Sequence, residues 1–415
     1  NDTLNTFLYS GEIKLNEEGN TVIRARSYRD DALPSKIVTG SFIFADEGFH
    51  DKCGGFSVPA VSIVAEPDHF YSDQIGIYVK GENGIEGKGD CGNGVDEKRN
   101  YNQDWKRPVN FEFIENGNVK VSQSLEAAVM GGCSRGDNRK WKSLKITASK
   151  KQGSGGNLIG YKDFFEDKSN MEFKAVQLRN GGNDYDGIRI RDGVMQAILN
   201  GMDVDRQAYR PVAFYINGEY GGLFGLRERT NKDYVYSNYG YEEEDLDVIE
   251  ITAKDGITAS TGTADYFNEM IKVAGENQSD AGYMAKMSKY MDVNEYVDYM
   301  TFEQYIVNTD WPGNNIKVWR ERNHGVFRWL VYDTDFGFGL YQSYGPNYCD
   351  PDMNTIKFST GESEQKNWAN EEEWQCELFK NLLGNKDFQK KFITRNLFNL
   401  KKFYCYERVK PIIDS

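Results

Sequence analysis

The side chains that could do chemistry gather between positions 310 and 337. They are the oxygen-bearing residues Asp310, Asn314, Asn315, Asp333 and Asp335. Between them, residues 316–332 carry two alternating or β-branched and aromatic runs around a polar turn, a pattern that predicts a β-hairpin. Since the two ends of a hairpin lie side by side, these amides and carboxylates should meet. Hard oxygen ligands grouped in this way suit Mg²⁺ or Mn²⁺ better than zinc.

The order of these residues indicates phosphoryl transfer. Four residues separate Asp310 from Asn315, and Asp335 opens an Asp-Phe-Gly run. Protein kinases use this order: the first Asp orients the attacking hydroxyl, and the Asn and second Asp hold the metal on ATP. Either half alone is common by chance, and a structural hairpin with polar ends is the alternative. Their combination across one hairpin favours the catalytic interpretation.

Composition narrows the classes of protein to which the chain could belong. The 415 residues are 39% hydrophobic, with 26 Tyr and 24 Phe, which supports packed cores in two or three domains and argues against disorder. The net charge of −14, with no block of basic residues, argues against nucleic-acid binding and is compatible with a basic protein partner. The three His occur in no hydrolase or zinc motif. No apolar run is long enough to span a membrane. Since no signal region opens the sequence, we expect a mature or excised fragment.

The first half of the chain predicts mostly strands. Short strands within residues 1–62 indicate a small all-β segment, and 81–102 is a long loop. Further strands are expected at 109–114 and 141–146. Residues 190–199 have helical spacing, and a hairpin turns at Asn217-Gly218, a strong local signal.

After about residue 230 the pattern becomes helical. Asp292 can cap a helix, with Glu295 completing a capping box. A C-terminal helix carries the expected apolar face Phe388, Phe392, Ile393, Leu397 and Leu400. The fold class is therefore α+β, with a β-rich half before a helical half. This is the two-lobe layout of a kinase, preceded by a small all-β segment.

Three blocks of sequence resemble the CotH family of secreted atypical kinases. They are Gly131–Arg135 with Lys142–Ile146, then Leu178–Gly182 with Tyr209–Val212 and Asn217–Arg229, and finally Asn308–Lys317 with Arg328–Gly337. The resemblance covers roughly residues 57–415, and 1–56 resemble a β module often placed before this domain. It implies a β-rich N-lobe at 57–230 and a helical C-lobe at 231–415. It also implies transfer of the γ-phosphoryl of ATP to Ser or Thr of a secreted or surface protein.

The resemblance also implies roles for single residues. Asp310 would be the catalytic base, and Asn315 with Asp333 or Asp335 would be metal ligands. Lys142 would bind phosphate from a strand, although a solvated strand face explains it as easily. Asp192 is the candidate acid to pair with Lys142, although a charge at a helix N-terminus is the commoner explanation. No glycine-rich kinase loop is present, so the turn with Gly132, Ser134 and Arg135 would cover the phosphates. Glu228 would meet adenine at the hinge.

Two alternative functions stay open. The same fold could transfer another ATP-derived group, such as AMP or an activated amino acid. A non-catalytic adhesion or carbohydrate-binding protein is the third possibility, although it has no need of the Asp310, Asn315 and Asp335 set. Six Cys and an extracytoplasmic location permit disulfides, and Cys349 with Cys376 is the expected pair.

Overall fold

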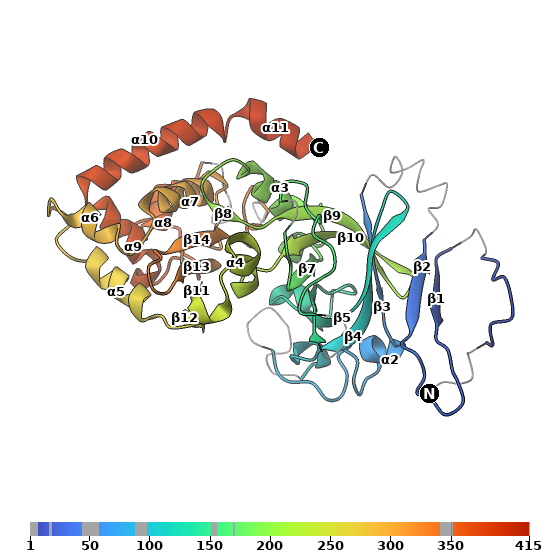
Figure 1. Ribbon diagram of the computed structural model, residues 1–415. Helices are drawn as coiled ribbons and strands as arrows, with labels where there is room; N and C mark the ends of the chain where they lie inside the picture. Colours follow the sequence, from blue (N-terminus) through green and yellow to red (C-terminus); the bar gives the residue numbers. More distant parts are fainter. Residues whose placement is uncertain are drawn as a thin grey trace.

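The computed structural model describes residues 7–15, 19–43, 58–87, 98–150, 156–168, 171–340, 350 and 352–414. The fold is α+β, and three sheets follow one another across the molecule (Figure 1). A two-stranded sheet lies at the N-terminal end, a closed barrel in the middle, and a five-stranded sheet packs among helices at the other end. The predicted fold class is confirmed at this level.

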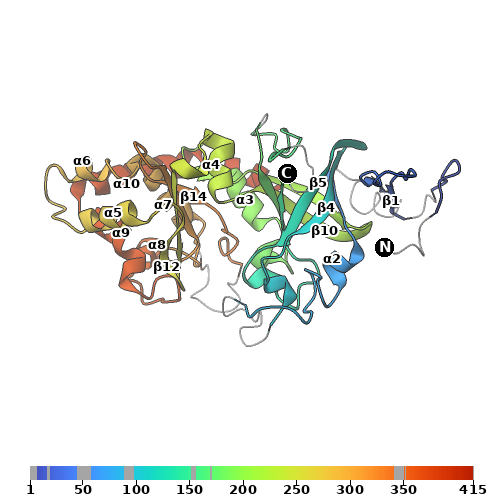
Figure 2. The same ribbon diagram turned by 60° about the horizontal axis from the view of Figure 1, so that its bottom comes forward.

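The N-terminal sheet is formed by β1 (Thr21–Ala25) and β2 (Val38–Phe42), which pair antiparallel with each other. It touches the barrel through a bond from Asn20 Nδ2 to the Gly218 carbonyl (3.1 Å) and through the Ser41 and Ser62 hydroxyls (2.8 Å). Figure 2 shows this sheet set to one side of the barrel. Strands are therefore present in the expected N-terminal segment, as an appendage to the barrel, although its first described residues, 7–15, form none.

The barrel closes in the strand order β10-β7-β6-β5-β4-β3-β9. Its strands are β3 (Ala60–Val64), β4 (Arg107–Glu115), β5 (Asn118–Val129), β6 (Leu144–Thr147), β7 (Ala175–Arg179), β9 (Tyr209–Ile216) and β10 (Glu219–Glu228). The predicted β9–β10 hairpin turns at Asn217 and Gly218, whose φ angles of 49° and 84° are those that a two-residue hairpin turn requires. Aromatic side chains fill the interior; Phe113 and Phe164 meet edge to face at 5.2 Å.

The second sheet has the order β12-β11-β13-β14-β8. Its strands are β8 (Asp205–Arg206), β11 (Leu246–Thr252), β12 (Gly256–Thr261), β13 (Ile316–Glu321) and β14 (Arg328–Val331). The hairpin expected from the sequence is β13–β14, which pairs antiparallel. The sequence predicts a mostly helical second half that contains this hairpin, and β11 and β12 are additional strands that the prediction missed. Since β8 precedes the last barrel hairpin and pairs with β14, it ties the two halves together.

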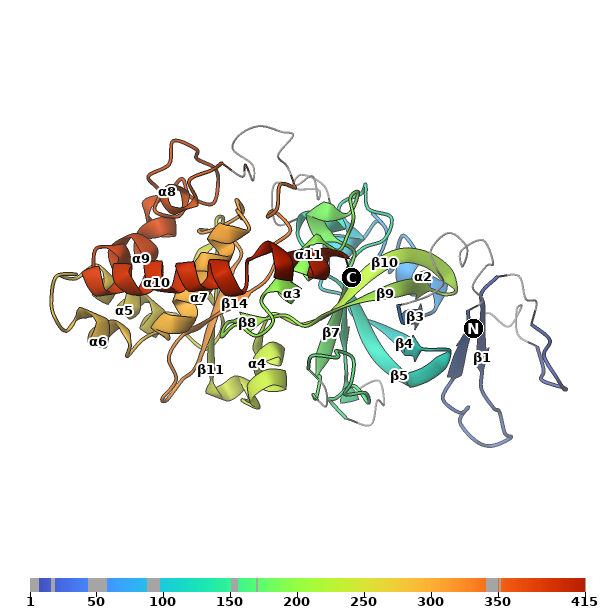
Figure 3. The same ribbon diagram turned by 90° about the horizontal axis from the view of Figure 1, so that it is seen from above.

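Most of the helices lie around this five-stranded sheet (Figure 1). The helices of the described residues are α2 (Pro67–Tyr71), α3 (Arg191–Ile198), α4 (Lys232–Tyr239), α5 (Asp265–Ala274), α6 (Tyr283–Met287), α7 (Val293–Tyr305), α8 (Thr355–Ser359), α9 (Glu373–Leu383), α10 (Lys386–Lys402) and α11 (Tyr406–Asp414), with α2 and α3 beside the barrel. Short 3₁₀ turns are η2 (Asn100–Asn102), η3 (Cys133–Arg135), η5 (Gly182–Asp184) and η6 (Glu243–Asp245). Figure 3 shows α10 and α11 running one after the other toward the barrel. In the described residues, no helix is long and apolar enough to cross a membrane.

Two helix details differ from expectation. Asp292 caps α7 through the amides of Asn294 and Glu295. The capping box is wrong, because the Glu295 carboxylate instead accepts the buried amide of Trp329 at 3.0 Å. On α10, Phe388 and Phe392 are buried. The expected apolar face is wrong for Ile393, Leu397 and Leu400, which are exposed, because α10 packs along a narrower stripe that also holds Asn399.

The cysteines also differ from expectation. Cys133 is disulfide-bonded, whereas Cys376 and Cys405 are free. The predicted pair of Cys349 with Cys376 is therefore wrong, because Cys376 is a buried free thiol and its pKa is raised to about 11 by burial. Cys349 itself lies outside the described residues. The spacing of the cysteines in the sequence does not determine which of them pair. The cysteine found in a disulfide is Cys133, in the 131–135 turn.

Candidate active site

Asp310 lies in the loop between α7 and β13 and is only 8% exposed. Three side chains donate to its carboxylate: Asn314 Nδ2 to Oδ1 at 2.7 Å, Asn315 Nδ2 to Oδ2 at 2.7 Å, and Trp368 Nε1 to Oδ1 at 2.5 Å. The sequence predicted the two asparagines as neighbours. Trp368, which follows 58 residues later, was not foreseen. Because the side-chain nitrogen of Asn315 donates to Asp310, its amide oxygen is the atom that could bind a metal.

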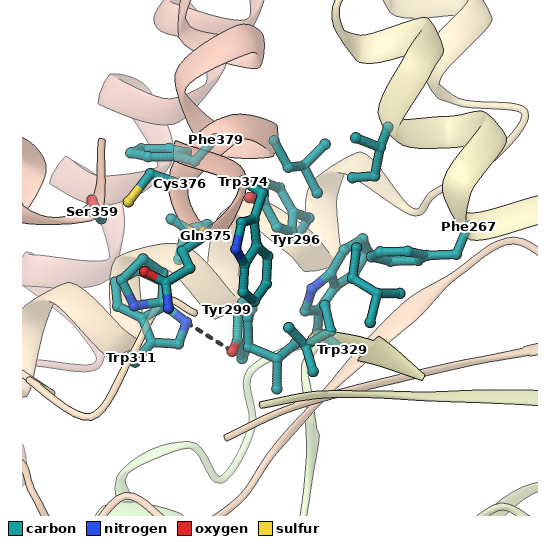
Figure 4. A pocket seen from close by; sticks show the side chains of 17 residues that line it. Phe267, Tyr296, Tyr299, Trp311, Trp329, Ser359, Trp374, Gln375, Cys376 and Phe379 are labelled. Carbon is teal, nitrogen blue, oxygen red and sulfur yellow. Dashed lines mark hydrogen bonds between the residues drawn. The ribbon is translucent and has the colours of Figure 1, made fainter. Parts of the chain in front are cut away.

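The loop that carries Asp310 is held by the packing of Trp311 and by a hydrogen bond from its own main chain. Trp311 is 2% exposed and its indole donates to the Tyr299 hydroxyl at 2.9 Å. Trp311 and Pro312 both line an apolar cavity of about 50 Å³. In Figure 4, Trp311 lies on one side of this cavity and Trp329 on the other. The backbone amide of Asp310 donates to Asn308 Oδ1 at 3.0 Å, so its main chain is fixed as well.

The surroundings raise the pKa of Asp310 to about 7. Burial is the largest cause, and the nearby carboxylates of Asp333 and Asp335 add to it, while the bonds from Trp368 and Asn314 oppose it. A carboxylate with a pKa near neutrality is suited to general-base work, because it can both accept and release a proton at the operating pH. Asp310 precedes β13, and Asp333 and Asp335 follow β14, its antiparallel partner, so the three carboxylates lie at the same end of the hairpin.

A second buried acid, Glu303, is linked to Asp310 through Asn308. Glu303, on α7, is 2% exposed and accepts Asn308 Nδ2 at 2.9 Å, and Asn308 in turn holds the Asp310 amide. Burial raises the pKa of Glu303 to about 8. Sequence analysis gave no role to either residue. The chain Glu303–Asn308–Asp310 sets the position of the catalytic candidate from within α7.

The raised pKa of Glu303 predicts a pH effect on stability. Because its folded-state pKa lies above the value in the unfolded chain, the stabilisation is complete below about pH 4 and is lost as pH rises toward 8. We therefore expect the melting temperature of Glu303→Gln to rise relative to that of the wild type between pH 5 and about 8.5. Thermal denaturation of both proteins across that range measures this. A constant difference would contradict the assignment.

Asp333 and Asp335 follow β14 and share one cation. Arg179 Nη2 lies between them, bonded to Asp333 Oδ1 and, at 2.6 Å, to Asp335 Oδ2. Asp335 is fully buried and also accepts the backbone amide of Asn183 at 2.9 Å. Burial raises the pKa of Asp335 to about 6; Arg179 opposes this, and the charges of Asp333 and Asp192 add to it. The sequence predicted the two carboxylates but not Arg179 or Asn183.

A glycine makes this contact possible. Gly182 has a φ of 63°, and a Cβ there would overlap both Arg179 Nη2 and Asp335 Oδ2. Only glycine allows the backbone to approach the ion pair so closely. The signal was present in the sequence, since the run Leu178-Arg-Asn-Gly-Gly182 ends an apolar strand with a cation and two glycines.

Asp192 lies behind this cluster and is 4% exposed. Arg227 Nη1 donates to Asp192 Oδ2, and the amide of Thr334 donates to Oδ1 at 3.1 Å, while Arg179 Nε lies 3.7 Å away. Burial favours the protonated acid, but Arg227 and Arg179 outweigh it and lower the pKa of Asp192. Asp192 on α3 thus connects the arginines of β7 and β10 to the Asp333–Asp335 segment.

The predicted pair of Lys142 with Asp192 is wrong. Lys142 Nζ donates to the carbonyls of Gly136 and Arg139, at 3.1 and 2.8 Å, and burial lowers its pKa to about 8. The physical reason is that β6 begins at Leu144, so Lys142 belongs to the preceding turn and not to a strand face. Arg179 on β7 is the cation that faces the carboxylates.

The turn at 131–135 lies beside the acidic centre. Asn180 Nδ2 donates to the Ser134 carbonyl at 3.1 Å, and Asn180 leads directly into the Gly182–Asn183 loop. Gly131 has a φ of 99°, and Gly132 and the disulfide-bonded Cys133 follow it. Arg135 donates to the carbonyls of Gly131 and Tyr101, so its guanidinium braces its own turn. The predicted turn is placed near the site, with Arg135 as its brace.

Glu228 has a different environment from the one expected. Its carboxylate is 1% exposed and accepts Lys168 Nζ, the Ala208 amide and Asn238 Nδ2, each at 2.7 Å. These contacts fasten β10 to α4. Both oxygens are thus engaged within the fold, Oε2 by Lys168 and Ala208 and Oε1 by Asn238, so Glu228 has a structural role in this arrangement.

The donor set fits Mg²⁺ held jointly with phosphates. In the part of the chain that the structure describes, no group of three or more His, Cys, Asp or Glu is arranged to hold a metal by itself. Asp333 and Asp335 nevertheless converge on a single positive charge, that of Arg179. Mg²⁺ is commonly bound by one or two carboxylates plus substrate phosphates and water. These two carboxylates, with the amide oxygen of Asn315, match that requirement.

The CotH kinase protein family model matches residues 129–415, which is more than half of the chain. The match begins just before the Gly131 turn, so it includes that turn, Arg179, Asp192 and the whole segment from Asp310 to Asp335. No curated protein matches the chain.

Proposed function

The chain belongs to the CotH kinase protein family, and from this premise we propose that it transfers the γ-phosphoryl group of ATP to a Ser or Thr hydroxyl of a secreted or surface protein. A divalent cation, Mg²⁺ or Mn²⁺, would be required. The observation that carries the proposal is the placement of Asp310 and the Asp333–Asp335 pair at one end of the β13–β14 hairpin. A barrel half and a helical half on either side fit the two lobes of a kinase.

Asp310 would act on the acceptor. Its carboxylate has a pKa raised to about 7 and is fixed by three donors, so it can orient the hydroxyl and take its proton. As the acceptor oxygen bonds to the γ-phosphorus, the bond from that phosphorus to the β–γ bridging oxygen breaks and ADP leaves. Asp310 later returns the proton to solvent.

The phosphates would be held on the opposite side. Asp333, Asp335 and the Asn315 amide oxygen would bind the metal, which supplies charge neutralisation on the phosphate oxygens. Arg179 lies within reach of both carboxylates and can offer its fork of N–H donors to phosphate oxygens. The backbone of the Gly131–Arg135 turn, pinned beside the centre through Asn180, would cover them. Arg179 takes the role that the sequence suggested for Lys142.

The disulfide at Cys133 supports the proposed location. Disulfides persist in oxidising compartments and are rare in the cytosol. Cys133 lies in the turn expected to contact phosphates, so the bond would also limit the movement of that turn. An extracytoplasmic protein that needs a fixed phosphate turn explains both features.

Nucleotide binding can be measured without knowing the acceptor. A ligand that binds the folded state raises the melting temperature through mass action, by an amount set by its concentration over its dissociation constant. We expect millimolar ATP to raise the melting temperature when Mg²⁺ or Mn²⁺ is present and to have little effect with EDTA. No metal-dependent shift would count against the nucleotide site, whereas a shift without metal would count against the role given to Asp333 and Asp335.

A further inference from the structure

The hydrogen bonds to Asp310 are shared unequally between its two oxygens. Oδ1 accepts from both Asn314 Nδ2 and Trp368 Nε1, while Oδ2 accepts, among the residues that the structure describes, only from Asn315 Nδ2. An ionised carboxylate offers about four lone-pair sites, two on each oxygen. Both sites of Oδ1 are therefore filled, and one site of Oδ2 remains for a further donor.

Trp368 comes from a segment that is fastened to the Asp310 loop on both sides. Asn367 Nδ2 donates to the Thr309 carbonyl at 2.8 Å, and the Gly313 amide donates to the Ala369 carbonyl at 2.7 Å. Gln375 Nε2 holds the carbonyl of Trp368 itself at 2.6 Å. The indole is thus placed by the main chain around it and is not a loose surface group.

The indole ring also contacts the other half of the site. It meets Phe336, the residue after Asp335, edge to face at 5.9 Å. Trp368 keeps 40% of its surface exposed, although Asp310 beside it is 8% exposed. Its N–H therefore reaches inward to the carboxylate while its ring lies at the surface, between the Asp310 loop and the segment that carries Asp335.

We propose that Trp368 is a positioning residue: with Asn314 it saturates Oδ1 of Asp310 and commits Oδ2 to the acceptor hydroxyl. The inference rests on the proposed phosphoryl transfer and adds an assignment of atoms to it. The acceptor O–H proton passes to Oδ2, the acceptor oxygen bonds to the γ-phosphorus, and ADP departs with the electron pair of the broken P–O bond. Without the indole N–H, Oδ1 competes for the hydroxyl and the carboxylate can rotate.

The variant that isolates the bond is Trp368→Phe, which keeps a ring against Phe336 and removes only the N–H donor. We expect kcat to fall about tenfold or more while KM for ATP and for the acceptor stays the same, because the loss is one of orientation. Trp374→Phe is the matched control, since Trp374 lies six residues further on, lines the apolar cavity and is not one of the side-chain donors to Asp310 seen in the described residues. This control should keep kcat.

A double-mutant cycle separates positioning from structural support. If Trp368 acts through Asp310, Trp368→Phe should cause no further loss of kcat in an Asp310→Asn background. Equal losses in both backgrounds, or an unchanged kcat in the single variant, would overturn the proposal. Wild-type protein without any phosphoryl transfer would instead show that the proposed function has failed.

A spectroscopic measurement tests the hydrogen bond from Trp368 to Asp310 even if the protein shows no phosphoryl transfer. In protein with ¹⁵N-labelled Trp, Trp368→Phe identifies the indole N–H signal of Trp368 among the signals of the seven Trp. A bond to a carboxylate should place this proton downfield, and Asp310→Asn should shift it back, since a charged acceptor makes the stronger hydrogen bond. A Trp368 signal that does not respond to Asp310→Asn overturns the proposal whatever the activity.

Discussion

Asp310→Asn should lower turnover by about 100-fold or more and leave binding of Mg-ATP nearly unchanged. The loss is that of a positioned general base. ATP binding should survive because the groups assigned to metal and phosphates, Asp333, Asp335 and Arg179, do not include Asp310. Phosphoryl-transfer assays and calorimetric titration with Mg-ATP measure the two effects separately.

The fold should tolerate this substitution. Burial already favours the neutral form of Asp310, so a neutral amide suits the site electrostatically. One amide oxygen cannot satisfy Asn314, Asn315 and Trp368 as two carboxylate oxygens do, so a small drop in melting temperature is expected. If Asp310→Asn abolished ATP binding while its melting temperature stayed near that of the wild type, Asp310 would be a phosphate or metal residue and not the base.

Asp335→Asn should abolish transfer and also weaken metal-dependent ATP binding. Asp335 is fully buried and is the carboxylate most closely held, by Arg179 and by both the amide and the side chain of Asn183. Mg²⁺ ligation needs its charge, since an amide oxygen is a much weaker partner for a hard cation. ATP titrations with metal and with EDTA, together with transfer assays, test this.

Asp333→Asn is the matched comparison. The Asp333 side chain is 29% exposed and accepts only from Arg179 among the bonds described. Water can therefore replace part of the ligation that Asp333 would supply to the metal. We expect a smaller loss of binding than for Asp335→Asn. Were both variants to retain ATP binding and transfer, the assignment of this pair to the metal would be wrong.

The sequence predicted the parts of the site that follow from local pattern. The β13–β14 hairpin has alternating residues between two polar ends, and that pattern alone indicates that Asp310 and Asp335 approach each other. The Asn217-Gly218 turn and the α7 cap at Asp292 are equally local. Each is determined within a few residues, which is why a single sequence can show it.

The parts that the sequence missed depend on contacts between distant segments. Trp368 reaches Asp310 from 58 residues away, and Arg179 reaches Asp335 from 156 residues away, so no spacing rule connects them. Lys142 was misplaced because the strand was predicted to begin at residue 141, three residues before its actual start at Leu144. The strands β11 and β12 were overlooked within a stretch whose overall pattern is helical.

Intact mass spectrometry after incubation with Mg-ATP tests the central claim most directly. Wild-type protein and an added Ser- and Thr-containing protein acceptor would be compared with the same mixture containing EDTA and with Asp310→Asn. The account predicts a mass gain of one or more phosphoryl groups on the acceptor or on the protein itself, only with metal and only with Asp310 present. A gain matching a nucleotidyl group would point to a different transferase, and no gain, or a gain that Asp310→Asn retains, would contradict the account.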